Sequence, residues 1–65
     1  MTFQISTEQE TEGRWLAEVD VLPGVMAYGA TRTDAVAKVQ AIALRVLADR
    51  MDHGVAVPEL LTVSF

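Results

Sequence analysis

The chain has 65 residues and no cysteine, which excludes disulfide bonds and thiolate metal sites and fits a reducing compartment. Its five basic residues are scattered and its net charge is −4, so the sequence argues against direct binding of nucleic acid by this chain. A domain this small usually needs disulfides, metals or association for stability. A single histidine makes no metal site by itself, and the apolar content of 51% favours association with other chains.

No segment is predicted to direct export or to span a membrane. The N-terminal sequence MTFQISTEQE is polar and acidic, without the basic start and apolar run of a signal peptide. The predicted helix carries Lys38, Arg45 and Asp49 among its charged residues, too many for a bilayer span. We therefore expect a single cytoplasmic domain over residues 1–65.

The first half of the chain predicts an antiparallel meander. Apolar and polar residues alternate over residues 2–8 and again over residues 14–21, with a turn candidate at Glu12-Gly13 between them. Leu22-Pro23-Gly24 predicts a second turn, because proline lacks a backbone donor and glycine permits a positive φ. A short third strand is expected at residues 25–28.

The second half predicts one long helix and a final strand. Thr31 is the expected N-cap, and the acidic Asp34 favours the helix dipole. Gly54 is expected at the left-handed position that ends a helix spanning roughly residues 32–53. Residues 61–65 alternate again, and a right-handed crossover would place them parallel to the first strand. The expected fold is α+β, with topology β-β-β-α-β, sheet order 3-2-1-4 and one long helix on one face.

The predicted helix is apolar over a wider surface than one sheet can cover. Its charged side chains fall on one narrow stripe, and the apolar ones extend over about twice the 100° that packing on a sheet requires. Alanine is a good helix former anywhere and could thicken the stripe, but Leu44 and Met51 are less easily explained in this way. We therefore expect a second packing partner for the helix or the adjoining strands, most simply a symmetric copy in a homodimer or tetramer. The candidate oligomer-interface residues are Leu44, Met51 and Val25.

Acidic residues crowd into the first third of the chain, and two interpretations are open. They could form a solvated rim that keeps the protein soluble, or a surface that steers the approach of a basic partner. The apolar residues of the second and third strands, Trp15 among them, suit either a core or an interface hot spot. We expect Trp15 to lie in the core. The candidate partner-binding residues are Glu8, Glu10, Glu12, Met26 and Tyr28.

No catalytic, metal-binding or cofactor-binding motif is present. The glycines on either side of the third strand form neither G-x-G-x-x-G nor a Walker A loop. His53 has no spacing relation to a serine and suits a helix C terminus. Metal-assisted hydrolysis would need a pocket formed by Glu18, Asp20 and Asp34, and so short a chain provides few walls to exclude water. We expect no enzyme activity and no cofactor.

Several short motifs follow one another along the chain. Trp15-x-Ala17-x-Val19 precedes Leu22-Pro23-Gly24-Val25, and Gly29-x-Thr31-x-x-Asp34-Ala35 follows. This combination resembles the W-x-A-x-V…LPGV…G-x-T-x-x-E/D-A signature of HicB-family antitoxins, and the likeness continues through the helix and the Pro58-Glu59-Leu60 tail. Asp20 stands where the family usually has proline.

The resemblance implies a partial ribonuclease-H-like fold without nuclease activity. It also implies an antitoxin that neutralises a cognate HicA toxin, a small basic mRNA-cleaving protein, by occluding its RNA surface. Many family members append a DNA-binding segment, and residues 1–65 contain none, so we expect no DNA binding by this chain. The alternatives are a stand-alone structural or ligand-binding module of the same fold without a toxin partner and, third, a residual nuclease.

Overall fold

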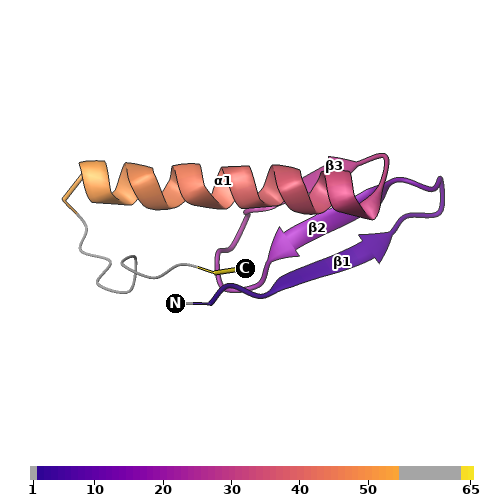
Figure 1. Ribbon diagram of the computed structural model, residues 1–65, viewed down its shortest axis with the longest axis horizontal. Coiled ribbons are helices and arrows are strands. Elements are labelled where there is room, and N and C mark those ends of the chain that lie inside the picture. Colours follow the sequence, from indigo (N-terminus) through magenta and orange to yellow (C-terminus); the bar gives the residue numbers. More distant parts are fainter. Residues whose placement is uncertain (1, 55–63) are drawn as a thin grey trace.

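The computed structural model describes residues 2–54 and 64–65. Within them, an antiparallel sheet of three strands lies against one long helix (Figure 1). The strands β1 (Ile5–Gln9), β2 (Trp15–Val19) and β3 (Met26–Gly29) lie in the order β1-β2-β3, and α1 (Arg32–Asp52) follows them. The predicted α+β class, the meander and the helix are confirmed. No helix of the described residues is long and apolar enough to cross a membrane.

The hairpin between β1 and β2 turns at Gly13, as the sequence predicts. The Glu10 N–H donates to the Arg14 carbonyl at 2.8 Å, and the Gly13 N–H donates to the Glu10 carbonyl at 2.9 Å. Gly13 has a φ of 99°, the left-handed conformation that short hairpin loops of this kind require and that glycine adopts without strain. The turn fixes the register, which places Ile5 opposite Val19.

The link between β2 and β3 is a type II turn. The Val25 N–H donates to the Leu22 carbonyl at 3.0 Å, with Pro23 and Gly24 at the two central positions. Gly24 has a φ of 82°, which this turn type demands at its third residue. Leu22 and Val25 are both buried by it. Val25 is only 6% exposed and belongs to the core, so its predicted place at an oligomer interface is wrong.

The core lies between one face of the sheet and one stripe of α1. Trp15, Ala17 and Val19 alternate along β2 toward the helix, and Trp15 is half-buried against the core as expected. The helix presents a residue at every fourth position, which is the spacing of one helical face. The helical core residues are Ala35, Val39, Ala43 and Leu47. Three of the fully buried residues between the helix and the sheet are alanines, Ala17, Ala35 and Ala43. Their small side chains let the helix approach the sheet closely.

The first turn of α1 is tied to the end of β3. Thr31 caps the helix by accepting a hydrogen bond on its Oγ1 from the Asp34 N–H at 3.0 Å, which confirms the predicted cap. A Cβ at Gly29 would lie 2.5 Å from the Ala35 nitrogen, so only glycine allows this approach. At the other end, Gly54 has a φ of 78° and its N–H donates to the Met51 carbonyl at 3.0 Å. Both predicted helix ends are therefore confirmed.

The two ends of the described chain lie side by side (Figure 1). Thr2 and Ser64 form a parallel bridge, in which the Phe3 N–H donates to the Ser64 carbonyl at 2.8 Å. The ring centroids of Phe3 and Phe65 are 5.7 Å apart. Most of the predicted last strand, residues 61–65, lies outside the described residues, so the sheet order 3-2-1-4 stays a prediction.

Candidate protein-binding face

The helix covers one face of the sheet, and no other element of the described residues 2–54 and 64–65 packs on the opposite face. Side chains alternate across a strand, so the residues between the core positions of β2 point away from α1. The register brings Glu18 of β2 opposite Ser6 of β1 and Met26 of β3. It also brings Leu16 opposite Glu8 and Tyr28. We call this surface the open face; its residues are Ser6, Glu8, Leu16, Glu18, Asp20, Met26 and Tyr28.

An apolar band occupies the β3 side of the open face. Met26 is 44% exposed and Tyr28 is 41% exposed, and Leu16 beside them is half-buried. The Arg14 guanidinium lies 4.1 Å from the centre of the Tyr28 ring, a cation–π contact that orients the ring. Two large apolar side chains are thus held at the surface of a short edge strand, which is the position where interface residues are expected.

Carboxylates occupy the β1 side of the open face. Glu8 and Glu18 flank Leu16 around a hollow of about 80 Å³. Both are exposed, and neither has an ion-pair partner in the part of the chain that the structure describes. Asp20 is held in place by the Ser6 hydroxyl, which lies 2.7 Å and 2.9 Å from its two carboxylate oxygens. The result is a row of three carboxylates next to the apolar band, of which Asp20 is held by a hydrogen bond.

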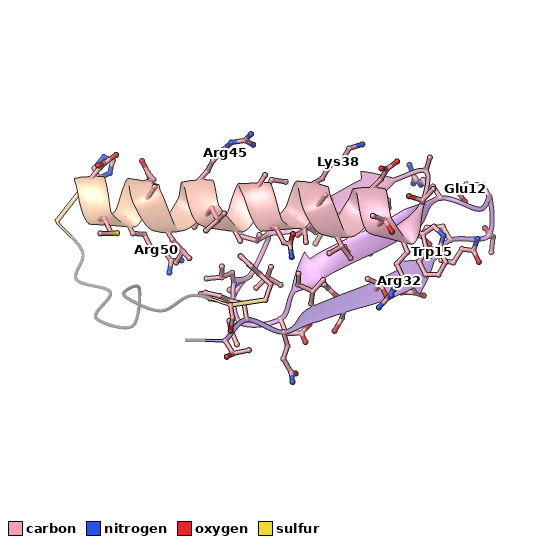
Figure 2. The ribbon with its side chains drawn as sticks, viewed as in Figure 1. Glu12, Trp15, Arg32, Lys38, Arg45 and Arg50 are labelled. Atoms are coloured by element: carbon pink, nitrogen blue, oxygen red, sulfur yellow. The ribbon has the colours of Figure 1, made fainter. Side chains whose placement is uncertain are left out.

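The acidic residues predicted as one set are divided between two places. Glu8 lies on the open face, whereas Glu10 and Glu12 belong to the hairpin turn, where Glu12 is labelled in Figure 2. The Glu12 carboxylate pairs with Arg14 Nε at 2.7 Å. A hydrogen bond from its own backbone N–H, together with the charge of Arg14, lowers the pKa of Glu12 below its ordinary value. Glu12 is therefore already partly neutralised within the chain.

The sequence-based set of partner residues omits Glu18 and Asp20. Both follow from the alternation of β2, because they occupy the positions that Trp15, Ala17 and Val19 leave on the other face. Their closeness to Glu8 and Ser6 depends on the register set by the hairpin. The alternation of apolar and polar residues along β2 is enough to predict the face on which Glu18 and Asp20 lie. Their neighbours on that face are known only from the pairing of β2 with β1.

The carboxylate pocket considered for hydrolysis is not formed. Glu18 and Asp20 lie on the open face, whereas Asp34 belongs to the helix that packs on the other side of the sheet. In the described residues, no three acidic, histidine or cysteine side chains are grouped to hold a metal ion. His53 ends α1, and its Nδ1 lies 2.8 Å from the Asp49 carbonyl oxygen. This is the helix-terminal role that the sequence predicts for it.

A second concave surface lies between β1 and α1. It is a groove of about 520 Å³ whose walls include Ile5, Thr7, Val36 and Gln40. Arg32 reaches from the first turn of α1 toward β1 (Figure 2), and its Nε donates to the Thr7 hydroxyl at 3.1 Å. Among the described residues, the groove combines polar and apolar walls with one cationic group, Arg32, and one carboxylate, Asp20.

The two remaining interface candidates, Leu44 and Met51, are exposed on α1 by 49% and 57%. They lie away from the sheet and take no part in the open face. The open face itself offers an apolar band and adjacent carboxylates, which suits contact with a basic protein surface.

Comparison of the chain with protein-family models, with curated proteins and with solved structures finds no match.

Proposed function

We propose that this chain is a HicB-type antitoxin that binds a small basic HicA-like toxin through the open face. The observation that carries the proposal is the row of Glu8, Glu18 and Asp20 beside Met26 and Tyr28. Such a surface attracts a basic protein over a distance and then buries apolar area on contact. A toxin that handles RNA must present a basic surface to the phosphates, and this face has the charge to compete for it.

The residues that resemble the HicB signature support the proposal because each has a structural task. The Trp15-x-Ala17-x-Val19 alternation supplies the core side of β2. The Leu22–Val25 segment forms the type II turn. Gly29 admits the helix and Thr31 caps it. The residues of the signature thus build the packing of α1 on one face of the sheet, and the open face remains available to a partner.

The same proposal includes a sheet of order 3-2-1-4 and a partial ribonuclease-H-like fold. The parallel bridge between Thr2 and Ser64 supports it, since a last strand beside β1 would have this direction. The hydrogen bond from Phe3 to Ser64 lies on the edge of the sheet opposite β3, where such a strand would have to pair. An antitoxin of this kind acts in the cytoplasm, where its toxin meets mRNA.

The test is co-expression with a small basic protein encoded beside this chain. The chain is expected to relieve the growth arrest that the basic protein causes, to co-purify with it, and to inhibit its RNA cleavage. Failure of all three would contradict the antitoxin function. Glu18→Lys should weaken the complex at least about tenfold, because a like charge facing a basic surface is strongly unfavourable.

Asp49→Lys is the matched control for Glu18→Lys. It makes the same charge change at an exposed position of α1, outside the open face. The melting temperatures of both variants should stay near that of the wild type, because surface substitutions change stability little. If Asp49→Lys weakens the complex as much as Glu18→Lys, net charge rather than the open face governs binding.

The groove between β1 and α1 favours the second candidate, a stand-alone ligand-binding module. Its partly apolar walls, with Arg32 and Asp20 both in the lining, would suit a small molecule that carries an anionic group at Arg32 and a hydrogen-bond donor toward Asp20. Arg32→Gln would then abolish ligand binding and leave toxin binding unchanged. Glu18→Lys would have the opposite effects, so the pair of variants distinguishes the two functions.

A further inference from the structure

A line of apolar residues on α1, all exposed except the half-buried Ala41, has the spacing of a coiled-coil seam. Its members are separated alternately by four and three residues, which keeps them on one side of a helix over four turns. The line is distinct from the buried stripe that packs on the sheet. Its two large members, Leu44 and Met51, are exposed by 49% and 57%. We call it the helix seam; its residues are Ala37, Ala41, Leu44, Ala48 and Met51.

One border of the helix seam carries charges of both signs. Lys38, Arg45 and Asp52 recur at intervals of seven residues next to the seam. Figure 2 shows Lys38 and Arg45 extending from the side of α1 that faces away from the sheet. All three are exposed. A partner helix on the seam would therefore meet this charged border along its whole length.

The order of these charges favours one arrangement of two identical helices. In an antiparallel pair centred on Leu44, Ala37 faces Met51 of the second copy, and Lys38 faces Asp52 of the second copy. The two-fold axis repeats that ion pair at the other end. It also brings Arg45 beside Arg45 of the second copy, so two ion pairs flank one contact between like charges, whose long side chains extend into solvent. A parallel pair would place Lys38 beside the uncharged Thr33 of the second copy and form no such ion pair.

We propose that two copies of this chain associate through the helix seam, antiparallel and centred on Leu44. Small side chains on both sides of Leu44 let the helices approach closely, and Leu44 and Met51 are removed from water. The seam lies on the side of the molecule opposite the open face. The dimer therefore leaves both open faces accessible, one on each outer side.

Because the chain has no cysteine, single cysteine variants of the full chain report the arrangement directly. With a mild oxidant added, Leu44→Cys should form a covalent dimer rapidly, because this position lies on the two-fold axis. Ala37→Cys alone should not cross-link, and a mixture of Ala37→Cys with Met51→Cys should. Asp49→Cys, exposed on another side of α1, is the control for random collision.

A charge exchange tests the predicted ion pair independently. Lys38→Asp should weaken the dimer about tenfold, measured by sedimentation over a range of concentrations, because it places two acids together. Adding Asp52→Lys to the same chain should restore the affinity. A wild-type chain that stays monomeric at every concentration would overturn the proposal. So would rapid self-cross-linking of Ala37→Cys, or equal rates for Leu44→Cys and Asp49→Cys. These outcomes are independent of any toxin, so they leave the antitoxin function to its own test.

Discussion

The open face and the helix seam lie on opposite sides of the molecule and expose comparable amounts of apolar surface. Met26 and Tyr28 are 44% and 41% exposed on the sheet, while Leu44 and Met51 are 49% and 57% exposed on the helix. Exposed apolar area alone therefore does not distinguish the partners of the two surfaces. Their charges do, because the open face carries carboxylates and the border of the seam carries both signs.

The charges of the open face are mostly of one sign, since Glu8, Glu18 and Asp20 outnumber the Arg14 guanidinium over Tyr28, and such a surface pairs poorly with itself. Two open faces brought together would place Glu8 and Glu18 of each copy against like charges, which costs several kcal/mol. The helix seam has less conflict, because an antiparallel copy forms two ion pairs between Lys38 and Asp52 against one contact between the two Arg45 side chains. The sheet is thus suited to a different, basic protein and the helix to a second copy of the chain.

Gly29→Ala should have the largest effect, because it removes both surfaces at once. The added Cβ would lie 2.5 Å from the Ala35 nitrogen and 2.8 Å from the Asp34 Cβ, so the first turn of α1 must shift away from the end of β3. We expect a loss of about 3 kcal/mol in the free energy of unfolding. Chemical denaturation measures it.

Gly13→Ala is the control for this variant. Its φ of 99° is strained for alanine, but no atom lies within 4 Å of the added Cβ. The expected loss is about 1 kcal/mol. An equal loss at both glycines would mean that the close approach of α1 to β3 does not constrain the fold.

Substitutions in the buried stripe of α1 and in the helix seam should lower stability in different ways as the protein concentration changes. Val39 is fully buried, so Val39→Ala should cost about 2 kcal/mol at any protein concentration. Leu44→Ala removes a side chain that is exposed in one chain and should cost less than about 0.5 kcal/mol when the protein is dilute. At high concentration its cost should grow, because only the wild type gains stability from association. Melting temperatures measured across a concentration series check both, and a cost for Leu44→Ala that is constant with concentration contradicts the seam.

The features predicted correctly from the sequence are those that a few neighbouring residues determine. The turn at Gly13 depends on a local backbone conformation that glycine favours, and so does the helix end at Gly54. Thr31 caps the helix through a residue only one turn away. The strands and the helix follow from the period of their apolar residues, which needs no knowledge of their neighbours.

The features that the sequence did not predict depend on contacts between distant segments. Val25 was predicted at an oligomer interface, and only the type II turn shows that it is buried within the chain. Glu18 joins Glu8 through strand pairing, which the alternation within one strand does not specify. The sequence places Gly29 beside the third strand, but only the structure shows that the backbone of α1 lies too close to it for any side chain.

Glu12→Gln should have the smallest effect and should locate the boundary of the open face. Hydrogen bonding to its own backbone N–H, together with the charge of Arg14, lowers the pKa of Glu12 below 4.5, the ordinary value. A group whose pKa is lower in the folded state stabilises the fold above its unfolded pKa and loses that contribution as the pH falls through the folded pKa. Wild type and Glu12→Gln should therefore differ slightly at neutral pH and converge below pH 4.5, as thermal unfolding across a pH series would show.

Binding of the basic partner gives the second measurement for Glu12→Gln. Because Arg14 Nε lies 2.7 Å from the Glu12 carboxylate, this charge is already compensated, and its loss should leave the affinity near that of the wild type. Glu18 has no such compensation in the described part of the chain, so Glu18→Gln should weaken binding measurably. Equal losses for the two variants would extend the partner's contact to the hairpin turn and would return Glu12 to the interface.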